Sequence, residues 1–369
     1  MSSTRAILSE EGQHLSEFHP RRYLSNGHLQ TIFGNFLSRP DHLPEPVSQL
    51  VEVAPARGSQ IASQVLCECH WQPVAVRASR PTAIILHGLE GSSRSQYVVG
   101  NANKLWKAGC NIVRMNMRNC GGPKDQMARL TPTLYHSGLS SDVDHVMRFF
   151  IKQEALQSVA LIGYSMGGNL ILKLAGELGP EAPPQLRSVI GVSPVMDLGP
   201  SADALHEIQN RIYERRFLKA LLRRFRRKAA LFPRAFDPQR AAGINSLRAF
   251  DDRITALYSG FKSADDYYHR AACARVLDRI AIPTLLLHAC DDPFIRITPE
   301  TRAMIAANPH ITLLETRHGG HCAFLSTPDP ENGIDGYWAE QTTVRFVLSH
   351  AQTAAEHLTE QPFSGQPVS

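Results

Sequence analysis

From about residue 81, the chain alternates short apolar runs with longer segments in which apolar residues recur every three or four positions. The apolar runs predict buried strands, and the longer segments predict helices that pack on them. The predicted strands cover residues 82–88, 111–118, 158–164, 187–195, 282–289 and 310–316, and the predicted helices cover residues 94–109, 142–155, 166–179, 298–309 and 338–351. Because such alternation requires right-handed crossovers, it predicts an α/β fold with a mostly parallel sheet and helices on both faces.

The same pattern divides the chain into parts. Ahead of the alternation, QLVEVA and SQIASQVLCECHW predict an antiparallel hairpin. The alternation stops near residue 199 and resumes near residue 282, and the sequence between these points is helical, basic and without strand-like runs. The predicted parts are an N-terminal extension (1–46), an α/β core in two pieces (47–198 and 282–350), a helical cap insertion (199–281) and a flexible tail (351–369).

One serine stands at a predicted strand-to-helix corner, in LIGYSMGGNLILKLAG. Ser165 follows an apolar strand, precedes a helix and has Gly163 and Gly167 two positions away on either side. Glycines at these positions allow a strained turn in which any Cβ would collide with the adjacent strand and helix. Such a turn exposes the hydroxyl and directs a helix N-terminus at developing negative charge. We predict that Ser165 is a nucleophile.

A serine nucleophile needs a base, and the base needs an acid that orients it. The predicted strand at 282–289 leads into CDDPFI, where Asp291 or Asp292 can supply the acid. Asp292 is favoured because a proline follows it and fixes the turn, while Asp291 remains open as the acid or as a turn residue. The base is His321, which follows two glycines, or His318, which closes the last strand, and His321 is favoured. Their HxxH spacing is not the HExxH of a helical zinc site, so no metal is predicted.

Acyl chemistry also needs backbone N–H groups that bind a developing oxyanion. The N–H of Met166, directly after Ser165, is one predicted donor. The second donor is the N–H of Leu89, within HGLEG after the first parallel strand, where glycines let a substrate oxygen approach. His87 opens this loop, and because it precedes the serine in the chain we interpret it as a residue that fixes the loop.

Taken together, these segments make the chain resemble the α/β-hydrolases and, more narrowly, the YheT-like esterase/lipase family. The resemblance rests on NGHLQTIF, LHGLEGSS, NMRNCGG, LYHSGLSSDV, GYSMGGN, DDPF and GGHCAF, which span about residues 20 to 345. It implies a carboxylic ester hydrolase for lipid or medium-chain acyl substrates, with acyltransferase side activity in some members. It also places the family triad on Ser165, Asp292 and His321. Two positions depart from the family pattern: Asn119 replaces a usual glycine, and Cys322 stands where many relatives carry glycine or valine.

Other residues in these segments have no evident catalytic duty. Arg118, Tyr135 and His136 are interpreted as structural, with Arg118 able to pin loops. Ser140 or Ser141 is expected to cap the helix that begins near Asp142.

Composition indicates the cellular compartment in which this chemistry takes place. No stretch approaches the roughly 18 to 20 apolar residues of a membrane span, and MSSTRAILSEEGQHLSE lacks the apolar core of a secretory signal. Seven cysteines without a CxxC pair are typical of reduced thiols, and Cys67 and Cys69 are interpreted as small hydrophobes on one strand face. These features predict a cytoplasmic protein.

The positive charge is concentrated in one segment. The whole chain carries a net charge of +5, whereas RIYERRFLKALLRRFRRK (211–228) contains nine basic residues and one acidic residue. A net charge this modest does not by itself call for a nucleic-acid partner. Within the segment, apolar residues recur as a helical stripe at Phe217, Leu218, Leu221, Leu222 and Phe225. The segment is either a cap helix with its stripe on the core and a solvated basic face, or a helix that docks on anionic lipid.

The sequence therefore predicts a serine carboxylic-ester hydrolase that forms an acyl-enzyme and needs neither metal nor organic cofactor. Its expected partner is a small-molecule acyl ester, with peripheral membrane contact through the basic helix as an added hypothesis. Two alternatives stay open: acyl transfer to an alcohol through the same residues, and a binding protein of the same fold without turnover.

Overall fold

The computed structural model describes residues 5–6, 17–56, 58 and 61–351, and its centre is one twisted sheet. The described strands form a nine-stranded sheet in the order β1-β9-β8-β7-β6-β4-β5-β3-β2. Strands β4 to β9 pair with one another in parallel. The strands are β1 (Arg5–Ala6), β2 (Val47–Ala54), β3 (Ser63–His70), β4 (Thr82–Leu86), β5 (Asn111–Met115), β6 (Val159–Tyr164), β7 (Leu186–Val192), β8 (Thr284–Ala289) and β9 (Ile311–Thr316). The predicted hairpin is β2 and β3, and it joins the sheet antiparallel to β5.

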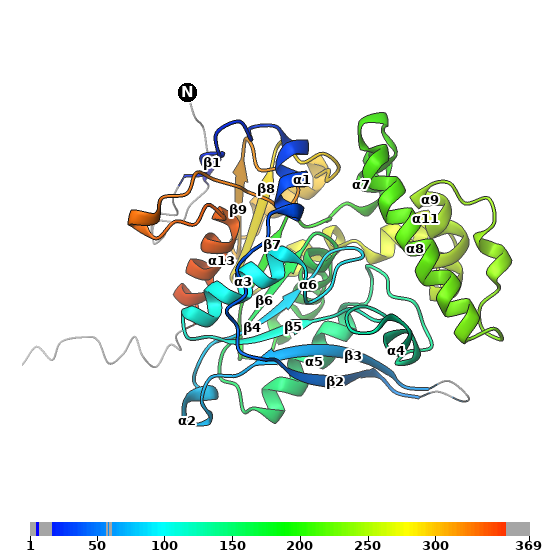
Figure 1. The fold of residues 1–369 in the computed structure, drawn as a ribbon, viewed down its shortest axis with the longest axis horizontal. Helices are drawn as coiled ribbons and strands as arrows, with labels where there is room; N and C mark the ends of the chain where they lie inside the picture. The colour runs from blue at the N-terminus through cyan, green and yellow to red at the C-terminus, as the bar shows by residue number, and fades with distance from the viewer. Residues whose placement is uncertain (1–4, 7–16, 57, 59–60, 352–369) are drawn as a thin grey trace, which may run out of the picture.

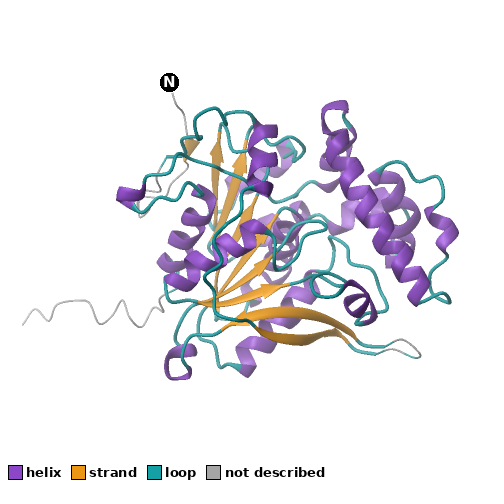
Figure 2. Cartoon of the chain, in the orientation of Figure 1, coloured by secondary structure: helices purple, strands orange, loops and turns teal. Residues whose placement is uncertain are grey.

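Helices cover both faces of the sheet, as the alternation predicts (Figure 2). One face carries α3 (Gln96–Lys107) and α13 (Trp338–Ser349), and the other carries α5 (Ser140–Gln153), α6 (Met166–Leu178) and α12 (Pro299–Ala307). Alternate side chains of β4 enter different cores: Ile84 packs in the α5–α6 core, while Ile85 packs in the α3–α13 core. A strand buried on both faces must be apolar at every position, which explains the uninterrupted apolar runs.

The remaining described helices are short or lie outside these layers. They are α1 (Gly27–Phe36), α2 (Val74–Arg77), α4 (Lys124–Arg129), α7 (Leu198–His206), α8 (Arg211–Leu231), α9 (Leu247–Phe250), α10 (Leu257–Ser259) and α11 (Ala264–Ala271), with a π-helix at Asp251–Ala256 and short 3₁₀ turns between them. Residues 193–283, all of which the structure describes, contain helices and turns but no strand. Figure 1 shows α7, α8, α9 and α11 as a group beside the sheet. No described helix combines the length and apolarity needed to cross a membrane.

The basic face of helix α8 is less exposed to solvent than the sequence suggests. Its stripe packs on the core, because Leu218, Leu221 and Phe225 are buried. However, two of its cations also turn inward. Lys228 is fully buried, and its Nζ donates to the backbone carbonyls of Ala128 and Thr131, each at 2.6 Å. The Arg224 side chain is only 18% exposed and is ion-paired. The basic face of α8 is therefore solvated only in part.

One further expectation gains detail and another needs correction. Residues 27–36 form a helix, α1, inside the segment described from sequence only as an extension. The predicted serine cap of α5 is wrong: the helix begins at Ser140 itself, and no side chain caps it. Ser140 Oγ instead donates to Glu177 Oε2 at 2.5 Å, which gives this buried hydroxyl a hydrogen-bond partner. Most of the predicted tail, residues 352–369, lies outside the described residues.

Candidate active site

Ser165 occupies the corner between β6 and α6 in a strained conformation, with φ of 54°. A Cβ at Gly163 would lie 2.4 Å from the carbonyl oxygen of Gly167, and one at Gly167 would lie 2.5 Å from that of His87. Both flanking positions therefore exclude any side chain, as expected from their spacing around the serine. Such strain persists only where the surrounding structure imposes it, and here it leaves the Ser165 side chain partly exposed at the start of a helix.

An aspartate and a histidine meet on the loops that follow β8 and β9. Asp292 Oδ2 lies 2.8 Å from His321 Nδ1, and the Asp292 side chain is completely buried. Its other oxygen, Oδ1, accepts hydrogen bonds from the backbone N–H groups of Phe294 and Ile295 at 3.1 and 2.9 Å. The carboxylate is thus fixed by its own turn, and its contact with Nδ1 of His321 favours a proton on that nitrogen, which leaves Nε2 with a free lone pair.

The electrostatics of this pair favour charge on both partners. Burial would raise the pKa of Asp292, but the adjacent His321 holds that pKa below its ordinary value. Burial likewise opposes protonation of His321, but the neighbouring Cys322 and the carboxylate of Asp292 raise the pKa of His321 above its ordinary 6.5. An imidazole of raised basicity accepts a proton readily, and its imidazolium form is stabilised by the aspartate.

The alternative acid and base form a looser pair nearby. Asp291 Oδ2 lies 3.5 Å from His318 Nδ1, and neither residue lines the two cavities that contain Ser165. Asp291 Oδ1 accepts a 2.8 Å hydrogen bond from the N–H of Gly320, directly before His321. Burial raises the pKa of Asp291. This geometry makes Asp291 a residue that holds the loop carrying His321.

The two predicted oxyanion donors are available at the corner. In the described part of the chain, neither the N–H of Leu89 nor that of Met166 donates to another protein group. His87 fixes the Leu89 loop: its Nε2 accepts from the N–H of Met117 at 3.1 Å, and its Nδ1 bonds the carbonyl of Gly88 at 2.7 Å. Burial lowers the pKa of His87 to about 4, so both nitrogens act as a neutral clamp.

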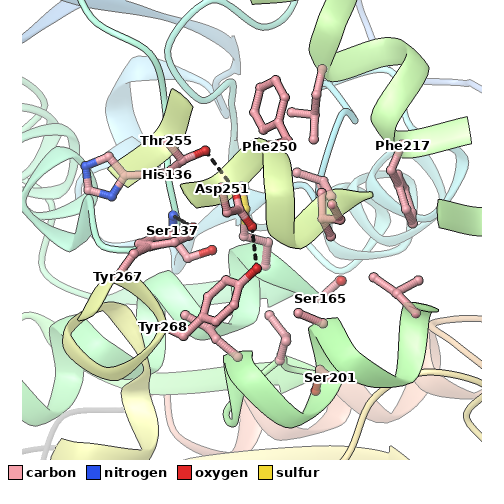
Figure 3. A pocket seen from close by; sticks show the side chains of 18 of the residues that line it. His136, Ser137, Ser165, Ser201, Phe217, Phe250, Asp251, Thr255, Tyr267 and Tyr268 are labelled. Atoms are coloured by element: carbon pink, nitrogen blue, oxygen red, sulfur yellow. Dashed lines mark hydrogen bonds between the residues drawn. The ribbon is translucent and has the colours of Figure 1, made fainter. Parts of the chain in front are cut away.

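Two cavities meet at Ser165. The first encloses about 900 Å³ of empty space, part of it open to solvent, and is lined mainly by apolar side chains that include Leu89, Met166, Phe217 and Phe225. Figure 3 shows Ser165 on one side of this cavity and a polar group on the other, where Thr255 and Tyr268 donate to Asp251 at 2.7 and 2.8 Å. The second cavity is lined by Ser165 and His321 together, and it opens between α1 and α8.

Helix α1 holds the loop that carries His321, and sequence reasoning missed this role. The N–H of His321 donates to Thr31 Oγ1 at 2.8 Å, and Gln30 bonds both the N–H and the carbonyl of Leu325. Glycines make this contact possible, since a Cβ at Gly27 would lie 1.9 Å from the carbonyl oxygen of Asp291. The available signal was Asn26, whose side chain caps the helix through the N–H groups of the first turn.

Helix α8 holds the Leu89 loop from the other side. Arg224 Nε and Nη2 donate to the two carboxylate oxygens of Glu90 at 2.8 and 3.0 Å, and Tyr135 Oη donates to Glu90 Oε1 at 2.6 Å. Glu90 directly follows Leu89. Arg224 also donates to the carbonyl of Asn119, whose φ is 64°. Asparagine is the residue that best tolerates this conformation after glycine, which accounts for its replacing the glycine that is usual in the family pattern.

The remaining candidate residues are structural in their contacts. Arg118 donates to both carboxylate oxygens of Asp142 at 2.7 and 2.5 Å, so it pins the start of α5. His136 lines the apolar cavity, and its Nδ1 accepts from the N–H of Gly138 at 3.1 Å. Cys67 and Cys69 are buried in one core, on one face of β3. Among the described residues, no group of three or more His, Cys, Asp or Glu is arranged to hold a metal ion.

The fold and the corner at Ser165 together define an α/β hydrolase. Residues 81–328 match the family described as alpha/beta hydrolase fold, and the chain belongs to this family. Within it, the chain falls in the YheT-like group, as the sequence motifs predict: it is 32% identical over 315 residues to the Escherichia coli (strain K12) protein named "Putative esterase YheT", covering 84% of this chain and 87% of that protein.

Other relatives carry lipase names. Phospholipase ABHD3 of Bos taurus is 27% identical over 329 residues, which cover 88% of this chain and 76% of that protein. The monoacylglycerol lipase of Saccharomyces cerevisiae is 29% identical over 255 residues, covering 67% and 55% of the two chains. The crystal structure of 2,6-dihydroxy-pseudo-oxynicotine hydrolase superposes with a TM-score of 0.52 at 17% identity, over 89% of this chain and 72% of that chain, and supports the fold alone.

Proposed function

We propose that this protein is a serine carboxylic-ester hydrolase with Ser165 as nucleophile, His321 as general base and acid, and Asp292 as the residue that orients His321. The proposal is carried by the 2.8 Å contact between Asp292 Oδ2 and His321 Nδ1. The same histidine lines one cavity together with Ser165. The family and the names of its relatives, which include an esterase, a phospholipase and a monoacylglycerol lipase, support an ester substrate.

The proposed reaction has two steps. His321 Nε2 removes the Ser165 proton as Oγ bonds to the acyl carbon, and the carbonyl oxygen becomes an oxyanion that the N–H groups of Leu89 and Met166 bind. The ester C–O bond then breaks, and His321 returns the proton to the leaving alcohol. In the second step, water gives a proton to His321 and attacks the acyl-enzyme, which releases the carboxylic acid and restores Ser165.

The two cavities suggest how an ester would lie. The leaving alcohol must be near His321, which protonates it, so we assign the alcohol to the cavity between α1 and α8. The acyl chain then enters the apolar cavity, which contains Ser165, Leu89 and Met166 but not His321. That cavity ends at the buried carboxyl of Asp251, whose pKa burial raises to about 6. A polar end of this kind disfavours long alkyl chains, and we propose short-to-medium acyl esters of lipid-like character.

We also propose peripheral contact with an anionic membrane. Three exposed cations of α8, Arg216, Lys219 and Arg223, line the cavity that holds His321, and the described residues place no carboxylate in ion-pair contact with them. A cationic rim attracts anionic lipid, each basic residue contributing up to about 1 kcal/mol near a charged surface.

A fluorophosphonate probe tests the nucleophile. We expect covalent labelling of the wild-type protein, located on Ser165 by mass spectrometry, and none of Ser165→Ala. The label blocks the hydroxyl that must attack, so a labelled protein should also lose hydrolysis of p-nitrophenyl esters, assayed as a panel from acetate to palmitate. Absence of labelling in a folded wild-type protein would contradict the proposal and favour a binding protein. Ester product that forms in preference to acid when an alcohol is added would identify acyl transfer instead of hydrolysis.

A further inference from the structure

Helix α1 is amphipathic in the reverse sense: it buries its small and polar face and exposes its apolar face. Its buried residues are Gly27, Gln30, Thr31 and Gly34. Large apolar side chains occupy the opposite face at i, i+3, i+4 and i+7 spacing and are exposed, namely Leu29 (41%), Ile32 (37%), Phe33 (42%) and Phe36 (73%). A surface helix of a globular protein normally does the opposite, and a contiguous exposed apolar stripe marks a surface that binds something.

The cause of this reversal lies in the active-site loops. The buried face of α1 lies against the backbone of the residues around Asp291 and Ala323, and a Cβ at Gly34 would approach the Ala323 Cβ to 2.5 Å. The face that fits there carries glycines and the hydrogen-bonding side chains of Gln30 and Thr31. The need to hold His321 therefore fixes the orientation of the helix, and the apolar stripe must face away from the loops.

The stripe borders the entrance to the active site. Ile32 and Phe36 line the cavity that contains Ser165 and His321. Across it, the first turn of α8 contacts α1 through His28 and Tyr213, whose rings stack 5.8 Å apart. Figure 1 places α1 at the end of the sheet toward which β8 and β9 point, while α2 lies at the opposite end.

The arginine and lysine side chains that line this entrance have no ion-pair partner among the described residues, whereas Glu90, which also lines it, is ion-paired with Arg224. Arg216, Lys219 and Arg223 are exposed on the face of α8 that lines the same cavity. Ile212 precedes Arg216 by one helical turn on that face and is 68% exposed. An apolar stripe flanked by unpaired cations complements a lipid surface with anionic headgroups, because the apolar side chains enter the acyl boundary while the cations contact phosphates.

We infer that the exposed face of α1, with the cationic face of α8, is a docking surface that seats the active-site entrance on an anionic lipid surface. The apolar contact comes from α1, because the apolar stripe of α8 is buried in the core. The inference rests on the proposed function in one respect, because it takes the docked lipid surface to be the source of the ester that the protein hydrolyses.

Vesicle co-sedimentation tests the docking surface without catalysis. Ser165→Ala protein is mixed with phosphatidylcholine vesicles with or without phosphatidylglycerol, at low and high salt. We expect binding that requires phosphatidylglycerol and falls with salt. Adding Leu29→Ser and Phe33→Ser, which do not line the active-site cavities, should weaken binding at least about tenfold, because two apolar side chains no longer insert. Val74→Ser is the matched control, since Val74 is 80% exposed on α2, and it should bind like the parent.

Three results would overturn the inference: no binding to anionic vesicles at low salt, equal binding by the Leu29→Ser/Phe33→Ser protein, or a dimer in sedimentation that this double variant dissociates. The last result would assign the face to a second copy of the chain. Failure of the proposed function is measured separately, because fluorophosphonate labelling of the wild-type protein does not depend on vesicles. In the active protein, the double variant should lower the ratio of activity on vesicle-bound ester to activity on soluble ester, whereas Val74→Ser should leave that ratio unchanged.

Discussion

The hydrolase core and the helical segment between β7 and β8 differ in how their functional side chains are placed. In the core, the proposed chemical groups lie at strand ends within short motifs, so Ser165, Asp292 and His321 have neighbours that mark them. In the helical segment, Arg224 and Arg226 lie two positions apart in one basic run, yet Arg224 is ion-paired beside the Leu89 loop and Arg226 is exposed. Local sequence therefore predicts a residue's chemistry in the core, whereas in the helical segment only the partner across the interface distinguishes one arginine from another.

The largest expected effect tests the core. Asp292→Asn should lower kcat for a soluble ester on the order of 10⁴-fold, because the amide leaves His321 in the wrong tautomer. Asp291→Asn should cost much less, since Asp291 bonds a backbone N–H and lies 3.5 Å from His318. Steady-state kinetics and circular dichroism of both variants provide the measurement. Equal losses would mean that the two aspartates share the role or that the loop was damaged.

Substitution of the proposed base should also lower kcat. His321→Ala should lower kcat by at least about 10³-fold, as removal of a triad member does. His318→Ala should have a far smaller effect because His318 does not line the cavities at Ser165. The same kinetic assay checks both, and a reversed order would assign the base to His318.

A matched pair of arginines tests the helical segment. Arg224→Gln should lower the free energy of unfolding by about 1 to 3 kcal/mol, because it leaves the carboxylate of Glu90 partly buried and unpaired. It should also lower kcat, since Glu90 adjoins the N–H of Leu89. Arg226→Gln removes the same charge from an exposed position and should change stability by less than about 0.5 kcal/mol. Urea unfolding with parallel kinetics compares them, and equal behaviour would remove the distinction between the two arginines.

The smallest expected effect is a shift in the pH dependence of kcat/KM. His321 must be neutral to accept the Ser165 proton, so kcat/KM should fall as pH drops through the pKa of His321. That pKa is raised above 6.5 by its neighbours, Asp292 among them, so the midpoint should lie above this value in the wild-type protein. Asp292→Asn removes the charge and should move the midpoint of its residual activity downward. An unchanged midpoint would contradict electrostatic coupling between the two residues.

The strand and helix pattern predicted the parallel sheet and its hairpin, because strands buried on both faces leave uninterrupted apolar runs. It did not predict α1, since a helix that buries Gln30 and Thr31 and exposes Phe36 reverses the usual pattern. The inward turn of Lys228 was equally hidden, because its acceptors are backbone carbonyls near residue 130. The glycines beside Ser165 and the proline after Asp292 can be recognised within a short motif. The contacts of Gln30, Thr31 and Lys228 cannot, because their partners lie on backbone that is distant in the sequence.

The hydrogen bond from His321 to Thr31 joins residues 290 positions apart, so it also sets an order of assembly. During synthesis from the N-terminus, the corner at Ser165 is complete long before His321 has been made. Helix α1 must wait for the same late segment, with Gln30 unbonded and its apolar stripe already exposed. Contacts of such long range form last, because their loop-closure entropy is offset only when the rest of the fold is in place. The nascent chain therefore carries Ser165 before its proposed base exists, and the site should become complete only when α1 and the segment around His321 come together.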